Sequence, residues 1–300
     1  MGQKSALRPD IAVGQALTAF AWNILDEART PLRDTTMADT VVVHDVRKAM
    51  KRWRALLRLM GPFLGKRGRK LRVSARDLAR GLASARDARS ALDALADIGD
   101  EYQSLSPRSL GSIKNRLEHQ RVIAEASILT DQMRGEVAAE LAEIAASISK
   151  WSLADIEFSD VTEGLSDTYR RAYDLIPEDW PAADPEELHE LRKRVVEHRY
   201  QMDFIEPLWP RLGRVWVSEA QRLRDRLGGH HDLTVLAQLT GNDQPLAAWR
   251  ARLAPVIRER QRDHMRTAAR LAGRLFAEKP SAFRRRLMRL WNNRVRAPAD

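Results

Sequence analysis

The chain has 300 residues, of which 44% are hydrophobic, and its formal net charge is +10. It contains no cysteine, which excludes disulfides and thiolate metal sites, and it has no run of about 18 apolar residues that could span a bilayer. The first ten residues are polar and predict no secretory signal, so we expect a cytoplasmic protein. Arginine outnumbers lysine 42 to 9. This excess suits phosphate recognition, but GC-rich coding produces it too, so only the clustering of cations is informative.

The sequence pattern predicts an all-α fold. Apolar residues recur at helical spacing in nearly every segment, and no sustained alternation predicts a strand. Ser106-Pro107 and Asp184-Pro185 each combine a capping residue with proline at a first helical position. In chain order, we predict helices over 10–29, 39–64, 68–98, 107–128, 131–149, 160–175, 185–207, 211–227 and 232–240, with further helix over 245–296.

Two of these predicted helices open with the same charged cluster. His44-Asp45-Val46-Arg47-Lys48 returns 145 residues later as His189-Glu190-Leu191-Arg192-Lys193. Without a gap, the same offset carries Pro62 onto Pro207, Gly68 onto Gly213 and Asp87 onto Asp232. A register held over this length indicates an internal duplication.

The duplication implies two helical-bundle repeats. By composition, the proline-rich stretch 176–185 is the best boundary between them. However, each duplicated helix should have a helix before it, which moves the boundary to about residue 155. We therefore predict two bundles of about four long helices each, over 1–155 and 156–300.

The first duplicated helix separates its cations from its apolar residues. At about 100° per residue, His44 and the cations that follow it occupy an arc of about 120°, with Arg52 flanking it. Trp53 and its apolar neighbours face the opposite side. A solvated helix face normally alternates in sign, whereas this one carries no acid, so it predicts an anion site. The cationic residues are His44, Arg47, Lys48, Lys51, Arg52, Arg54 and Arg58.

The second copy is a weaker version of the same pattern. His189, Arg192, Lys193 and Arg199 keep the angular positions of their counterparts, but Val196, Glu197 and Asp203 replace three cations. Each copy continues into another helix rich in cations, and the helix before the second copy carries a pair of arginines. Five of these arginines are expected either to join the same anion-binding groove or to be ordinary surface residues: Arg86, Arg170, Arg171, Arg222 and Arg226.

These paired motifs resemble the CHAD family, the conserved histidine alpha-helical domain. The resemblance rests on Val43–Arg54 and Leu82–Asp87, and on their equivalents Leu188–Lys193 and Arg226–Leu233, and it covers nearly the whole chain. It implies two pseudo-symmetric four-helix-bundle repeats that together form one domain. Their basic helices would line a central groove or pore that binds inorganic polyphosphate without catalysis. The implied ligand contacts are His44, Arg47, Lys48, Lys51, Arg52, Arg54, His189, Arg192, Lys193 and Arg199. The departures at Val196 and Glu197 predict an asymmetric site. An association with polyphosphate granules in the cytoplasm would follow.

Other chemistry finds little support in the sequence. Gly61–Lys66 has too short a spacing for a phosphate loop, and the adjacent His230 and His231 point about 100° apart on a helix, which disfavours a metal site. No carboxylate pair or nucleophile motif predicts an enzyme or a cofactor. Two alternatives remain open. One is a nucleic-acid-binding protein, although base-stacking aromatics are missing from the cationic face. The other is an accessory subunit of a polyphosphate-metabolising enzyme.

Overall fold

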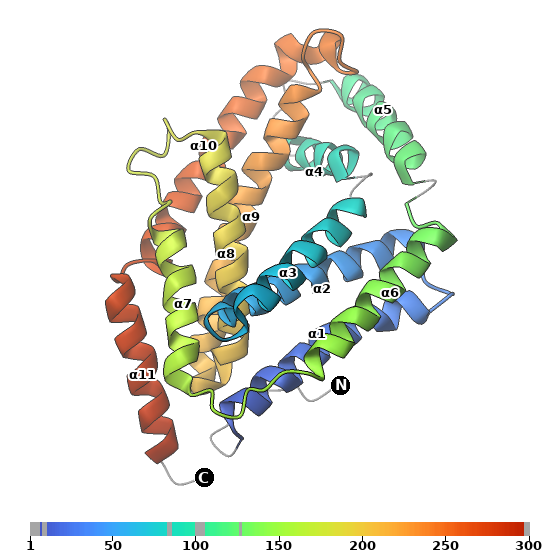
Figure 1. The fold of residues 1–300 in the computed structure, drawn as a ribbon. Coiled ribbons are helices and arrows are strands. Elements are labelled where there is room, and N and C mark those ends of the chain that lie inside the picture. Colours follow the sequence, from blue (N-terminus) through green and yellow to red (C-terminus); the bar gives the residue numbers. More distant parts are fainter. Residues whose placement is uncertain (1–6, 8–10, 83–85, 100–105, 126–127, 297–300) are drawn as a thin grey trace.

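The computed structural model describes Leu7 and residues 11–82, 86–99, 106–125 and 128–296; for Arg86 and residues 294–296 it describes the backbone alone. These residues form helices and no strand, which confirms the predicted all-α class (Figure 1). The helices are α1 (Val13–Arg33), α2 (Asp39–Leu59), α3 (Gly61–Gly81), α4 (Arg86–Gly99), α5 (Pro107–Glu125), α6 (Asp131–Ile148), α7 (Phe158–Tyr173), α8 (Pro185–Ile205), α9 (Pro210–Gln238), α10 (Arg250–Leu275) and α11 (Pro280–Arg296), with 3-10 turns η1 (Glu206–Leu208) and η2 (Ala247–Trp249).

Local signals in the sequence set several helix starts. Asp184 caps α8 by accepting a hydrogen bond from the Glu186 backbone N–H at 3.2 Å, and proline follows at the first helical position, as predicted. Thr130 caps α6 in the same way. The helix predicted from residue 107 begins at Pro107. These starts agree with the sequence because capping depends on neighbouring residues alone.

The single helix predicted over 68–98 is wrong. The chain forms α3 and α4 instead, and α3 already begins at Gly61, where Pro62 occupies its first turn. Gly81, the last residue of α3, is a poor helix former, and the carbonyl of the next residue, Leu82, accepts a hydrogen bond at 2.9 Å from Arg47 of α2.

The break predicted between 227 and 232 is also wrong, because α9 runs unbroken through Gly228 and Gly229. A side chain at Gly229 would lie 2.6 Å from the His264 ring of α10, so glycine is required there for close packing. The double glycine thus marks a helix crossing, not a helix end.

The helices form neighbouring groups around one large core. Helices α1, α2, α3 and α6 pack together, and so do α7, α8, α9 and α11, while α2 crosses α8 near the centre of Figure 1. Buried residues from both groups form one continuous cluster. A smaller cluster joins α4 and α5 to α9 and α10. None of the helices described is both long and apolar enough to cross a membrane. The repeat boundary near residue 155 stays a prediction.

Candidate functional site

The two faces of α2 are divided as the sequence predicts. Trp53 stacks on Trp151 with 5.6 Å between the ring centroids. The apolar residues that surround Trp53 on this face are also buried: Val43, Val46, Met50, Leu56, Leu57 and Met60. On the other face His44, Lys48 and Lys51 are exposed, whereas the arginines are partly buried. We call this set the α2 stripe: His44, Arg47, Lys48, Lys51, Arg52, Arg54 and Arg58.

Two arginines of the α2 stripe pair with acids of α8. Arg52 lies 3.2 Å from Asp203 and also pairs with Glu27 of α1. Arg58 lies 2.9 Å from Glu197. Under the 145-residue offset Glu197 corresponds to Arg52, and Asp203 corresponds to Arg58. Each pairing is therefore the reciprocal of the other, the pattern that a two-fold relation between α2 and α8 produces.

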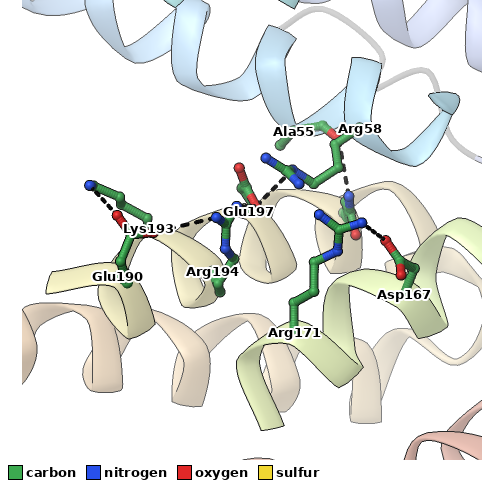
Figure 2. A network of polar contacts seen from close by, with 9 residues as sticks. Ala55, Arg58, Asp167, Arg171, Glu190, Lys193, Arg194 and Glu197 are labelled. Carbon is green, nitrogen blue, oxygen red and sulfur yellow. Dashed lines mark hydrogen bonds and ion pairs between the residues drawn. The ribbon is translucent and has the colours of Figure 1, made fainter. Parts of the chain in front are cut away.

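The acids that interrupt the second cationic pattern are thus counter-ions of the first. Glu197 is 7% exposed and also pairs with Arg194 at 3.0 Å, so one buried carboxylate serves two guanidinium groups (Figure 2). Beside it, Gln201 of α8 donates a buried hydrogen bond of 3.0 Å to the Ala55 carbonyl of α2. Ion pairs and a buried hydrogen bond therefore hold α2 and α8 together where they cross.

Arg54 is the cation of the α2 stripe that the protein leaves least satisfied. It forms no hydrogen bond or ion pair with a described residue, and its Nε is buried. Burial lowers the pKa of Arg54, Glu197 opposes that shift, and repulsion from Arg72, Arg76 and Arg194 adds to it. Such a partly buried charge is unfavourable unless an anion approaches it.

The cations of α8 are engaged to a greater extent. Lys193 lies 2.5 Å from Glu190, and the Arg199 guanidinium lies over the Tyr200 ring at 4.8 Å. The His189 ring lies 4.5 Å from that of His231. Arg192 lies against Gly228 of α9. Cations of the second copy are therefore engaged by neighbours on α8 and α9.

A second concentration of arginines surrounds a cavity of about 740 Å³ at the end of α2. Its walls come from α2, α3, α7 and α11, and two acids lie among them. Arg170 and Arg171 share one carboxylate, that of Asp167. The pair between Arg171 and Asp167 measures 2.8 Å and is drawn in Figure 2. The arginine cavity, as we call it, is defined by Arg58, Arg69, Arg72, Arg170, Arg171 and Arg284, with Glu163 and Asp167.

The remaining expected contacts lie elsewhere. Arg222 and Arg226 line a smaller cavity of about 390 Å³ between α4, α9 and α10, where four aspartates and His264 are their neighbours. Arg222 also pairs with Glu219 at 2.6 Å. The Arg86 side chain lies outside the described residues. Within the described part of the chain, no three histidine or carboxylate side chains converge as a metal site requires.

Sequence reasoning missed four contributors to these clusters. Arg194 corresponds to Ala49 in the first copy, so the duplication gives no hint of it. Arg69 and Arg72 stand out only as members of a cation-rich helix. Arg284 of α11 corresponds to Ala139 of α6 under the 145-residue offset, so the duplication does not indicate it and only the tertiary structure identifies it.

Comparison with known proteins agrees with this architecture. The sequence profile of the CHAD domain matches residues 20–241, well over half of the chain. No curated protein matches in sequence. Among solved structures, the crystal structure of the CHAD domain from the plant Ricinus communis is similar, with 19% sequence identity, a TM-score of 0.58 and coverage of 95% of each chain. At that identity the structural likeness shows the fold alone. The profile match shows the family: the chain belongs to the CHAD domain family.

Proposed function

We propose that this protein binds inorganic polyphosphate along the α2 stripe, with α8 supplying further contacts. The CHAD family is associated with polyphosphate, and the charge distribution of this chain fits a long anion. His44, Lys48 and Lys51 lie exposed along one face of α2, which offers a linear series of cations. From His44 to Arg58 the series spans about 21 Å at the helical rise of about 1.5 Å per residue.

The observation that carries the proposal is the state of Arg54. Its buried Nε has no hydrogen-bond partner, and although Glu197 attracts its charge, Arg72, Arg76 and Arg194 repel it. A folded protein normally pairs a charge that it buries. Phosphate oxygens would supply the missing acceptors and would cancel the repulsion, so binding would remove a defect of the unliganded protein.

Polyphosphate suits the α2 stripe better than nucleic acid does. Single-stranded nucleic acids are bound by combining cations with aromatic side chains that stack on bases. Trp53 is the aromatic residue of α2, and it is buried against Trp151 on the opposite face. A polyphosphate chain carries a charge on every phosphorus and has no bases, so it requires only the cations.

The cations of the α2 stripe would have two different roles. Arg52 and Arg58 are already paired with acids and hold α2 against its neighbours, so their contribution to binding would be mainly positional. Lys48 and Lys51, whose side chains are exposed to an approaching ligand, would carry more of the affinity together with Arg54. From α8, we propose His189, Arg192, Lys193 and Arg199 as weaker contacts. This function is binding without catalysis, and it would place the protein where polyphosphate accumulates in the cytoplasm.

A competition assay tests the proposal. Labelled long-chain polyphosphate bound to the protein is titrated with unlabelled polyphosphate, DNA, RNA or ATP at equal phosphate concentration in near-physiological salt. We expect polyphosphate to be the strongest competitor. The Arg54→Gln variant should bind polyphosphate about tenfold more weakly, because a charge-assisted contact is lost. Arg116→Gln, which changes an exposed arginine of α5, is the matched control. Equal or better competition by DNA would reject polyphosphate as the preferred ligand.

A further inference from the structure

The arginine cavity combines six arginines with only two acids. Asp167 already serves Arg170 and Arg171. Arg69, Arg72 and Arg284 form no hydrogen bond or ion pair with a described residue. The positive charge of the cavity therefore exceeds what its own acids can neutralise.

Repulsion inside the cavity acts on a residue of the α2 stripe. Burial lowers the pKa of Arg58, and Arg194, Arg72 and Arg171 lower it further, while Glu197 opposes the shift. Arg72 also repels Arg54, one turn earlier on α2. The α2 stripe and the arginine cavity are therefore electrostatically continuous, and Arg58 belongs to both.

Two glycines shape the cavity. At Gly164 of α7, a Cβ atom would lie 2.3 Å from the Leu59 carbonyl oxygen, so glycine allows α7 to approach the end of α2. Gly65 has φ 52° and ψ −128°, a left-handed conformation that kinks α3 just before Arg69. Because Gly61, Gly65 and Gly164 all line the cavity, its wall carries few bulky side chains between the arginines.

From this arrangement we propose that the arginine cavity binds the terminal phosphate groups of a polyphosphate chain whose interior lies on the α2 stripe. This inference rests on the proposed function. A terminal phosphate offers three oxygens and, like a phosphate monoester, a charge of about −1.5 to −2 near pH 7. An interior phosphate carries about one charge. A cluster of arginines converging from four helices suits the more highly charged group, whereas a linear stripe suits the interior of the chain.

The α11 wall of the arginine cavity lies outside the segment that matches the family profile. Arg284 and Ser281 line the cavity but lie beyond residues 20–241, the segment that matches the family profile. Arg285, the next residue, is exposed and does not line the cavity. On α3, Arg67 is likewise exposed but does not line the cavity, whereas Arg69, two residues later, does. These neighbours provide matched controls, because each substitution removes one exposed arginine from the same helix.

The experiment compares the wild-type protein with a cavity variant, Arg69→Gln with Arg284→Gln, and a control variant, Arg67→Gln with Arg285→Gln. Calorimetric titration uses three probes: inorganic tripolyphosphate, a polyphosphate of defined length no longer than the α2 stripe, and the same polyphosphate with both ends blocked as phosphoramidates. We expect the wild type and the control variant to bind the free-ended chain at least tenfold more tightly than the blocked chain. The cavity variant should lose this difference, and should bind tripolyphosphate at least tenfold more weakly.

The three probes also separate the possible sources of the terminal phosphate. Tripolyphosphate binding that depends on the cavity, together with no effect of end-blocking, would overturn the chain-end assignment in favour of a free short oligophosphate. Equal binding by the cavity and control variants would overturn the site itself. Neither result would affect the proposed function, provided that the blocked chain still binds and that Lys48→Gln with Lys51→Gln weakens it. If the blocked chain bound without dependence on α2, the proposed function would fail instead.

Discussion

Glu197 of α8 lies 2.9 Å from the Arg58 guanidinium of α2, and both side chains are almost completely buried. Arg194 approaches the same carboxylate at 3.0 Å. One carboxylate thus pairs with two arginines at the point where the duplicated helices cross. Removing a single partner from a buried ion pair leaves an uncompensated charge, which costs more than the pair contributes.

Glu197→Gln should therefore lower the free energy of unfolding by about 3 kcal/mol. Glu190→Gln is the control, since Glu190 pairs with Lys193 and Arg194 at a more exposed position and should cost less than about 1 kcal/mol. Chemical denaturation measures both. Added polyphosphate should raise the melting temperature of the Glu197 variant more than that of the wild type. A variant as stable as the wild type would show that Glu197 is dispensable.

The two copies should contribute unequally to binding. On α8, Lys193 is paired with Glu190, Arg199 packs on Tyr200, and Glu197 takes the place of a cation of the first copy. Because a charge-assisted contact contributes about 1.5–3 kcal/mol, Lys48→Gln with Lys51→Gln should weaken polyphosphate binding at least tenfold more than Lys193→Gln with Arg199→Gln. Titration of each folded variant at one salt concentration gives the comparison. Equal losses would mean that both copies contribute alike.

Affinity for polyphosphate should fall steeply with salt. If six to ten cations contact phosphates, binding should weaken by orders of magnitude between about 50 and 200 mM salt, by analogy with counterion release from DNA. The measurement is the slope of the logarithm of the affinity against the logarithm of the salt concentration. A flat dependence would indicate a small site with few charges, contrary to the proposal.

Buried histidines should make the protein sensitive to mild acid. Burial lowers the pKa of His198 to about 3, and burial with repulsion from His264 and His231 lowers the pKa of His230 to about 4. In the unfolded chain a histidine has a pKa of about 6.5. The stability that each neutral ring contributes is therefore complete above about pH 6.5 and is lost as the pH falls toward the folded-state value.

His198→Phe tests this dependence. The ring lies among Tyr169, Phe276 and Phe283, so phenylalanine should fit the site without titrating. Between about pH 6 and 4 the free energy of unfolding of the variant should fall less steeply than that of the wild type, by about 1.4 kcal/mol per pH unit. His119→Gln, at an exposed position on α5, should leave the slope unchanged. Identical slopes in His198→Phe and the wild type would contradict the assignment.

Gly65→Ala should destabilise the protein by about 1–2 kcal/mol, because Gly65 has a positive φ that side chains with a Cβ rarely adopt. Gly61 lies one turn earlier without a positive φ, and a Cβ there would meet no atom within 4 Å. Gly61→Ala is thus a matched control and should be close to neutral. Thermal unfolding of both variants decides the question, and similar losses in both would remove the special role of Gly65.

The sequence predicts the parts of this fold that depend on local chemistry. The α8 start follows from Asp184 and Pro185, and the buried face of α2 follows from the spacing of Trp53 and its apolar neighbours. The hydrogen bond from Arg47 to the Leu82 carbonyl at the end of α3 does not follow, because its two residues are distant in sequence. The double glycine in α9 is misread for the same reason, since its purpose is contact with His264.

In the candidate site too, the sequence predicts what lies within one helix but not the contacts between helices. Periodicity identifies the α2 stripe because all its residues share one helix. It cannot show that Glu197 and Asp203, which weaken the second cationic pattern, lie against Arg58 and Arg52 of the first. Nor can it place Arg284 beside Arg58, because the cavity that joins them exists only when α2, α3, α7 and α11 have packed.

The reciprocal pairing of Arg52 with Asp203 and of Arg58 with Glu197 also restricts which helices can cross in this way. Two copies of α2 in the same geometry would bring Arg52 against Arg58 twice, and two copies of α8 would bring Glu197 against Asp203 twice. Both arrangements place like charges in contact inside a core, which is strongly unfavourable. Each of the two helices is therefore complementary in charge to the other but not to a second copy of itself. The charges at this crossing therefore favour the pairing of α2 with α8 within one chain and disfavour the pairing of either helix with a second copy of itself.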